Sequence, residues 1–243
     1  MEQQKGLTGS TLKIIAMVTM LIDHIGASIL ERGVMPKVAD GSVMDAGVEA
    51  MKVYNRWKVV DMACRGIGRI AFPIFCFLIV EGFFHTHDVR RYMGRLGVFA
   101  LISEIPYDLA FRGVPLEYAH QNVFFTLLIG IGMGVLLERN REWPVKAVIL
   151  LLAMWLAVLI RSDYNFRGVL LIFVFYIFHE SRWLAVTAGG FWNFLYQGVI
   201  QKYGVLSVLP LALYNGERGR KMKYFFYIFY PAHLLLLYGI SRF

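Results

Sequence analysis

The chain has 243 residues, of which 58% are hydrophobic and only 17% are charged, and its mean hydropathy is +0.55. A water-soluble domain of this length is more polar, so the composition indicates an integral membrane protein. The net charge of +8 comes from 25 lysines and arginines against 17 acids. Because the basic residues cluster in short gaps between apolar runs, we attribute this charge to membrane topology and not to nucleic-acid binding.

The sequence predicts no disulfide framework, no metal site and no signal peptide. Cys64 and Cys76 lie far apart, without a CxxC spacing and without companion histidines. The first apolar run, LKIIAMVTMLIDHIGASIL, is interrupted by Asp23 and His24 and is followed by no convincing cleavage site. We therefore expect this run to be a transmembrane helix of the mature protein.

Apolar runs near the length that crosses a bilayer, about 20 residues, occur throughout the chain. They lie at about 12–30, 66–84, 93–111, 122–138, 145–161, 166–179, 183–200, 203–216 and 224–241. We predict an all-α, polytopic transmembrane helical bundle of about nine spans, forming a single domain over residues 1–243. The most basic short loops face the cytoplasm if the N-terminus is cytoplasmic, as the positive-inside rule favours.

The longest connection between these runs, at about 31–65, is expected to be an external loop. Within it, Met44, Val48, Met51 and Tyr54 recur at helical spacing. This spacing predicts a helix that lies on the outer surface of the membrane.

Ionisable residues interrupt the first three predicted spans. They are Asp23 and His24 in the first, Arg69 and Glu81 in the second, and Glu104 and Asp108 in the third. Each charge costs about 2.5–3.5 kcal/mol at the bilayer centre on insertion scales, so these groups must pair or line a wet cavity. Apolar residues in place of these ionisable groups would usually stabilise the protein equally well. Their presence therefore favours a polar path with a function.

Lys13 and His24 occupy one face of the first predicted span. Eleven residues at about 100° each bring the two side chains to within roughly 20° of each other, about 16 Å apart along the axis. A cation at the cytoplasmic end and an imidazole deeper within match the anionic phosphates and the distant thioester of coenzyme A. Histidine suits the far end because its pKa near neutrality lets it accept a proton from an amine or hydroxyl.

Seven stretches of the chain resemble a known family. They are LKIIAMVTMLIDHIG, GRIAFPIFCFLIVEGFFHT, RLGVFALISEIPYDL, QNVFFTL, SDYNFRGVL, LYNGERGR and FFYIFYPAHL. Their order resembles TraX-like proteins, and the lysine-to-histidine spacing is similar to the signature of the transmembrane acyltransferase superfamily. The resemblance implies acetyl transfer from cytoplasmic acetyl-CoA to an acceptor presented within or across the membrane, with His24 in the catalytic position and Lys13 contacting the donor.

This interpretation assigns three sets of residues. The catalytic set is His24 as general base, assisted by Asp23 or Glu104. The residues expected to bind acetyl-CoA are Lys13, Arg91, Asn215, Arg218, Arg220 and Lys221. The residues expected to bind the acceptor are Arg69, Asp108, Asn122, Asp163, Arg167 and His233. The acceptor would be an amine or hydroxyl of an envelope sugar, lipid or peptide, and the protein would lie in the bacterial cytoplasmic membrane in contact with lipid.

Alternative interpretations keep the buried charges but change their role. A proton-coupled small-molecule transporter would also place carboxylates, arginine and histidine within the membrane. Such transporters usually show paired halves, which this sequence lacks. Asp23 and His24 could instead form a hydrogen-bonded pair that only ties helices together, and Arg69 with Glu81 could form a structural ion pair.

Overall fold

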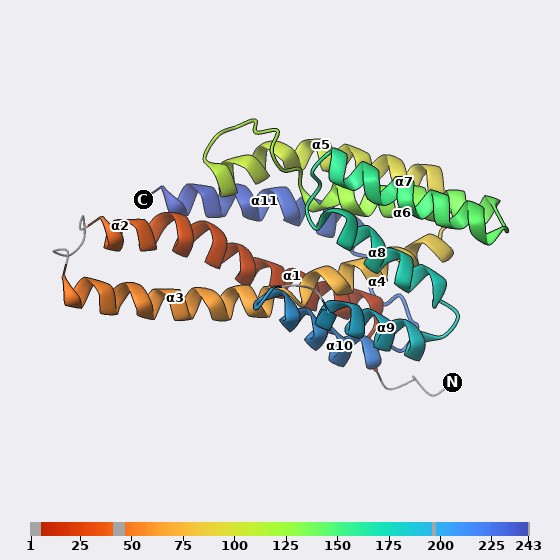
Figure 1. Ribbon diagram of the computed structural model, residues 1–243, viewed down its shortest axis with the longest axis horizontal. Helices are drawn as coiled ribbons and strands as arrows, with labels where there is room; N and C mark the ends of the chain where they lie inside the picture. The colour runs from red at the N-terminus through yellow and green to blue at the C-terminus, as the bar shows by residue number, and fades with distance from the viewer. Residues whose placement is uncertain (1–5, 41–46, 196–197, 243) are drawn as a thin grey trace.

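The computed structural model describes residues 6–40, 47–195 and 198–242, and most of them lie in helices (Figure 1). Within these ranges the β-structure consists of two isolated bridges, Leu7 with Tyr214 and Gln121 with Ser162. The prediction of an all-α chain is confirmed.

The helices follow one another in chain order through short connections. They are α1 (Gly9–His24), the π-helix η1 (Ile25–Val34), α2 (Met35–Ala39), α3 (Val48–Gly68), α4 (Ala71–Phe84), α5 (Val89–Arg112), α6 (Val123–Arg139), α7 (Trp143–Leu159), α8 (Asn165–Ile177), α9 (Arg182–Leu195), the 3₁₀-helix η2 (Gln201–Ser207), α10 (Val208–Ala212) and α11 (Lys223–Ser241).

Fewer helices than expected are suited to cross a membrane. In the described ranges, three continuous helical stretches are long and apolar enough, namely Gly9–Ala39, Val48–Phe84 and Tyr224–Ser241. Two apolar helices, α7 and α8, are shorter. Helix α8 has 13 residues and therefore covers about 20 Å of a hydrocarbon core about 30 Å thick. The prediction of about nine spans was wrong in number, although helices occur where the apolar runs lie.

The segment predicted as a loop, 31–65, is largely helical. The first helix does not end at Leu30, because α1 continues through η1 and α2 to Ala39, and α3 begins at Val48. Helix α3 then leads almost directly into α4, and α1 to α2 run beside α3 in the left part of the view (Figure 1). The segment therefore consists mainly of two long antiparallel helical stretches, and its external location stays a prediction.

An ion pair joins the continuation of the first helix to α3. Glu31 Oε1 lies 3.4 Å from Nε of Arg65 on α3, so the first acid after the run is partnered by the neighbouring helix. The helical spacing of Met51 and Tyr54 correctly predicts that they lie on a helix. Met44, which belongs to the same predicted pattern, lies outside the described residues.

Helix α4 forms the centre of the core. Its sequence, AFPIFCFLIVEGFF, is apolar apart from Glu81, and most of its residues are buried. It packs against α1, α6 and α8, and Phe77 meets Phe175 of α8 edge to face with the ring centroids 5.6 Å apart. The helices that carry polar groups are therefore held around an apolar axis.

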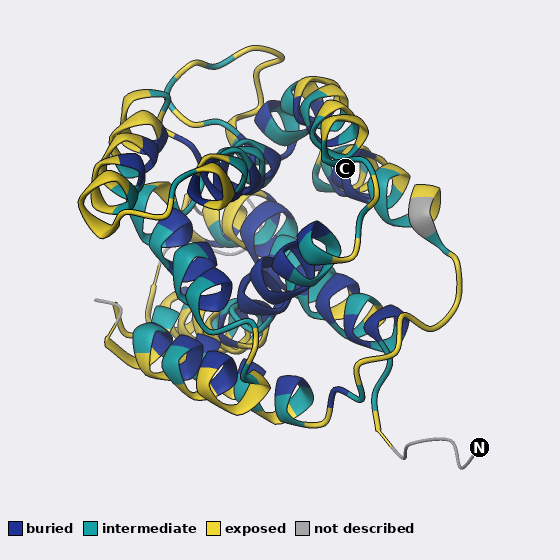
Figure 2. Cartoon of the chain, turned by 90° about the vertical axis from the view of Figure 1, so that its right-hand side faces the viewer, coloured by how far each residue is buried: buried dark blue, intermediate teal, exposed yellow. Residues whose placement is uncertain are grey.

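The outer faces of the bundle are also apolar. Figure 2 shows buried residues turned toward the interior and exposed residues along the outside of the helices. On α7 the outward residues Leu151, Leu152 and Trp155 are 58 to 62% exposed. Large hydrophobic side chains left outside in such numbers mark a surface that contacts lipid.

Helices α1 and α3 approach each other closely at Gly68. A Cβ atom placed on Gly68 would lie 2.1 Å from the Cβ of Asp23. Because the Cβ of Asp23 is fixed to the α1 backbone, only a movement of the helices could relieve this contact. Glycine at this position thus allows Asp23 to reach the side chain of the next residue, Arg69.

We predict that Gly68→Ala lowers the free energy of unfolding by about 1–3 kcal/mol, because overpacking forces the two helices apart. The matched control is Gly94→Ala on α5, where an added Cβ meets no atom within 4 Å. That control should be neutral or raise stability by up to about 1 kcal/mol, as expected for alanine in a helix. Thermal unfolding in detergent compares the two variants, and equal stability would contradict the close contact.

Candidate functional site

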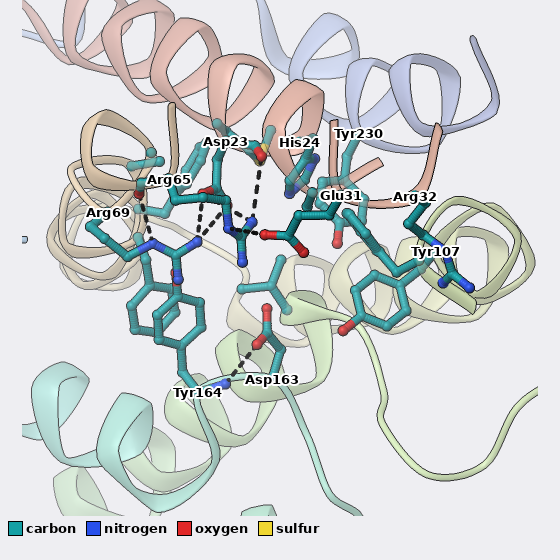
Figure 3. Close-up of a pocket in the computed structure, with 18 of the residues that line it drawn as sticks. Asp23, His24, Glu31, Arg32, Arg65, Arg69, Tyr107, Asp163, Tyr164 and Tyr230 are labelled. Carbon is teal, nitrogen blue, oxygen red and sulfur yellow. Dashed lines mark hydrogen bonds and ion pairs between the residues drawn. The ribbon is translucent and has the colours of Figure 1, made fainter. Parts of the chain in front are cut away.

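A cavity of about 670 Å³ opens between α1, η1, α3, α5 and the turn before α8 (Figure 3). Its volume lies in the range of pockets that hold a small ligand or a short peptide. The charged groups that line it are the acids Asp23, Glu31 and Asp163 and the arginines Arg32, Arg65, Arg69 and Arg112. His24 and the aromatic residues Phe72, Phe75, Tyr107, Phe111, Tyr164 and Tyr230 complete the wall. The cavity therefore combines an excess of cations with broad apolar surfaces.

Asp23 is the centre of an ion-pair network. Its two carboxylate oxygens accept hydrogen bonds from Nη2 of Arg69 at 2.6 Å, and Oδ1 lies 3.1 Å from Nη1 of Arg65. Arg65 lies in the last turn of α3 and Arg69 directly follows the helix, four residues on, so both reach the same acid on α1. Arg69 also donates to Gln201 Oε1 at 3.2 Å. The alternative pairing of Arg69 with Glu81 is absent from the described residues, where Glu81 accepts from the hydroxyl of Tyr214.

His24 forms a hydrogen-bonded pair with His233 of α11. Nδ1 of His24 lies 2.7 Å from Nε2 of His233, and Nδ1 of His233 lies 2.7 Å from the carbonyl oxygen of Phe229. A carbonyl only accepts, so Nδ1 of His233 carries a proton, and with both rings neutral His233 accepts at Nε2. Nδ1–H of His24 must then donate to His233. The other ring nitrogen of His24, Nε2, then carries a lone pair.

A strained turn brings Asp163 and Tyr164 to the cavity. Arg161, Tyr164 and Asn165 have φ angles of 55°, 59° and 44°, which non-glycine residues rarely adopt and which cost about 1–3 kcal/mol each. The turn is held by the segment before α6, since Gln121 N–H donates to the carbonyl of Arg161 and Asp163 N–H donates to that of Gln121. Such strain is typical of functional sites, and here it points the SDYN stretch at the ion-pair network (Figure 3).

The carboxyl group of Asp163 titrates in the acidic to neutral range. Burial raises its pKa to about 6, although Arg69, Arg65 and the backbone N–H of Tyr164 favour the ionised form. The carboxylate of Asp23 adds to the increase. The charge of the cavity therefore becomes more positive as the pH falls through 6.

Glu104 and Asp108, predicted to assist His24 and to bind the acceptor, lie outside this cavity. They line a second and smaller cavity of about 270 Å³. Glu104 Oε2 accepts from the backbone and side-chain N–H groups of Asn122, which caps α6. The amide of Asn122 also donates to the carbonyl of Ala100 at 2.7 Å, so this residue joins α5 to α6.

The residues predicted to bind acetyl-CoA do not line the cavity that contains His24. The side-chain ammonium of Lys13 lies 5.2 Å above the ring of Phe226. Arg91 is bound to its own helix cap, with Nε 2.9 Å from Oδ2 of Asp88. Lys221 is exposed.

The loop that contains Asn215, Arg218 and Arg220 caps the start of α1. Gly9 N–H donates to the carbonyl of Glu217 at 2.7 Å, and Ser10 N–H donates to that of Arg218 at 3.0 Å. These bonds satisfy N–H groups that a helix start leaves free. The α1 start is thus already occupied by protein carbonyls.

Of the remaining residues predicted to bind the acceptor, Arg69 and Asp163 line the large cavity and His233 supports His24 behind it. Arg167 lies on α8 with its guanidinium 5.4 Å from the ring centroid of Phe166.

The sequence interpretation missed several residues of the cavity. The most important is Arg65, and Glu31, Arg32, Tyr107 and Tyr230 were also absent from the predicted set. One signal could have identified Arg65, because it precedes Arg69 by four residues and therefore shares its helix face. The aromatic residues gave no such signal in a chain with many aromatics.

We predict that Asp23→Ala lowers the free energy of unfolding by about 3–5 kcal/mol, because it leaves two largely buried guanidinium groups without their shared acid. The matched control is Glu49→Ala, which removes an exposed ion pair with Lys52 and should cost less than about 1 kcal/mol. Denaturation in detergent measures both. A loss for Asp23→Ala no larger than that of the control would show that the network does not join α1 to α3.

We predict that Asp163→Asn stabilises the protein above pH 6 and has no such effect below about pH 4. The raised pKa means that the folded state holds this proton more tightly than the unfolded state, so stability is lost as pH rises between the ordinary value of about 4 and about 6. Asparagine removes that loss. Thermal unfolding from pH 4 to 8 tests this, and a parallel pH dependence in both proteins would contradict the assignment.

The amino-acid sequence matches known proteins over nearly its whole length. Residues 8–241 match the family described as TraX protein. The chain is also similar to the "Probable fimbrial assembly protein FimC, serogroup H1" of Dichelobacter nodosus. The identity is 26% over an alignment 257 residues long, which covers 96% of this chain and 95% of the relative. No solved structure matches the chain.

These matches correct the function predicted from the sequence. The relative is a probable fimbrial assembly protein, and the matches support neither an acetyl-CoA acyltransferase with His24 as base nor the alternative, a proton-coupled transporter. The resemblance noted in the motifs is confirmed at the level of the family, and the membrane character agrees with the apolar helices. Because the family match covers nearly the whole sequence, the chain belongs to the TraX family.

Proposed function

We propose that this protein acts in the assembly of fimbriae and that its large cavity binds a segment of a fimbrial subunit. The observation that carries the proposal is the similarity to a fimbrial assembly protein over nearly the full length of both chains. The family match over residues 8–241 spans the residues of the cavity as well as the membrane helices. We also propose that the protein lies in the bacterial cytoplasmic membrane, which its apolar helices and its basic short loops favour.

The chemistry of the cavity favours a carboxylate on the bound segment. Arg65 and Arg69 are engaged with Asp23, whereas Arg32 forms no ion pair within the described chain and donates from Nη2 to the carbonyl of Arg112 at 3.1 Å. The remaining N–H groups of Arg32 can bind a carboxylate in the paired geometry that arginine prefers.

The rest of the wall suits the apolar part of a peptide. Phe75 and Phe111 offer flat surfaces, and the ring of His24 lies 5.0 Å from that of Phe111, edge to face. The Nε2 lone pair of His24 can accept a hydrogen bond from a backbone N–H of the segment. One carboxylate beside an apolar side chain is therefore the pattern that we expect to be recognised.

This proposal does not include acetyl-CoA, because the residues predicted to hold it lie away from the cavity of His24. The placement of the family in the transmembrane acyltransferase superfamily, the acetyl-CoA co-substrate and the enzymatic activity stay predictions from the motifs.

Site-specific photo-cross-linking tests the proposal. A photoreactive amino acid in place of Phe111 should capture the fimbrial subunit in cells, because that position lies in the cavity wall. The same amino acid in place of Leu152 on α7, which is 58% exposed, should capture none above background. Equal capture at both positions, or no capture at Phe111 in a strain that makes fimbriae, would contradict the proposal.

A further inference from the structure

The second cavity lies between α5, the segment that follows it, and α6, away from the ion-pair network of Asp23. Two acids of α5, Glu104 and Asp108, line it from one helix face, because they are four residues apart. Its other walls include the apolar side chains of Leu116, Phe125 and Ile160. The cavity is therefore lined by two acidic residues and by apolar side chains.

Each of these carboxyl groups has one buried oxygen without a partner. Asp108 is 1% exposed, and its Oδ2 accepts from the N–H of Glu117 at 2.8 Å, while Oδ1 has no hydrogen-bond partner in the described chain. Glu104 accepts from Asn122 through Oε2, and its Oε1 is equally without a partner. A buried acceptor left unsatisfied costs about 1–3 kcal/mol, and more if charged, so both oxygens require a donor.

The nearby charges do not supply that donor. The acid of Glu117 also lines the cavity, but Nε of Arg112 lies 3.4 Å from its Oε2. That ion pair engages Arg112 with Glu117, and in the part of the chain that the structure describes no group donates a hydrogen bond to Glu104 Oε1 or Asp108 Oδ1. Within the described residues, no three metal-ligating side chains converge, so a metal ion is a poor occupant. A cation with N–H donors satisfies both orphaned oxygens.

We propose that this cavity binds a primary ammonium group at the end of an alkyl stem, as on a lysine side chain of a partner protein. The ammonium donates to Glu104 Oε1 and Asp108 Oδ1, and the stem packs against Leu116, Phe125 and Ile160. An ethanolamine lipid headgroup fits less well, because its phosphate lies next to its ammonium and would be repelled by the same acids. The site goes beyond the proposed binding of a carboxylate in the large cavity.

Binding of small amines to the purified protein in detergent tests the site. Calorimetry with n-butylammonium should show saturable binding, whereas 1-butanol, which has the same stem and no charge, should show none. Glu104→Gln and Asp108→Asn should each weaken the amine at least tenfold, and Glu49→Gln, which changes an exposed acid, should leave it unchanged. Equal behaviour of amine and alcohol, or binding that survives both cavity variants, would overturn the proposal.

A second variant tests the site without removing either acid, so that its result does not depend on whether the acid variants fold. Leu116 is 59% exposed at the cavity, so Leu116→Lys can place its own ammonium between the acids. This variant should raise the melting temperature and abolish n-butylammonium binding. Val114→Lys, in the same connection but outside the cavity wall, should do neither. Unchanged amine binding in Leu116→Lys would count against the site.

The source of the ammonium is distinguished by two further probes. An Nα-acetyl-lysine amide should bind in competition with n-butylammonium. Nanodiscs rich in phosphatidylethanolamine should leave amine binding as it is in phosphatidylcholine. Loss of amine binding only in phosphatidylethanolamine, with no competition by the lysine amide, would overturn the assignment to a lysine side chain.

Discussion

The pairing of Asp23 with Arg65 and Arg69 is the interaction on which the site depends. A carboxylate and two guanidinium groups within apolar helices are tolerated only when each finds its partner, because the low polarity of the surroundings makes an isolated charge costly. The close approach at Gly68 is what lets α1 and α3 make these contacts. The same contacts fix the direction of α1 where it becomes the π-helix η1, directly after His24. Extended π-helical turns are rare and are frequently found at functional sites.

Two other devices are built around this network. The strained turn before α8 carries Asp163 and Tyr164 to it, and the ring of Tyr164 stacks on Phe72 with centroids 3.6 Å apart. On the opposite side, the chain from Phe229 through His233 orients the ring of His24. Each device holds a polar group of the cavity from an element remote in sequence. The cavity is therefore a product of the tertiary fold and not of any one motif.

Helix α5 separates the two cavities. Tyr107 and Phe111 face the large, cationic one, whereas Glu104 and Asp108 face the small, anionic one. The proposed site that binds a carboxylate and the proposed site that binds an ammonium lie on adjoining faces of this helix. The protein thus offers a partner two sites of opposite charge. A polypeptide partner with acidic and basic side chains can use both, and such paired contacts favour specificity over bare affinity.

Sequence patterns predicted the helices well and their number of spans poorly. Apolar runs locate α5 to α8 and α11, since helix formation in an apolar run is a local property. Whether a short helix crosses a membrane depends on its neighbours, and for α8 the length alone argues against it. The external loop at 31–65 was expected because Glu31 and Arg32 end the apolar run, and the partner that keeps Glu31 within the helix, Arg65, is remote in sequence.

The site was predicted in part for the same reason. Asp23, His24, Arg69 and Asp163 were selected as ionisable or polar residues in apolar surroundings, and they do meet in one cavity. The helical alignment of Lys13 with His24 was a correct local inference, but the cavity wall that contains His24 does not extend to Lys13. The contact of His24 with His233 joins the two ends of the chain, and periodicity within one helix cannot reveal it.

The central claim, that the large cavity serves fimbrial assembly, is tested most directly by counting surface fimbriae on cells. A strain lacking this protein should lose its fimbriae and regain them with the wild-type gene or with Trp155→Ala, a change on the outer face of α7. Arg32→Glu, which reverses one cavity charge and leaves the ion pairs of Asp23 intact, should restore fewer than a tenth as many at equal protein level. Normal fimbriae on the deletion strain, or full restoration by Arg32→Glu, would contradict the claim.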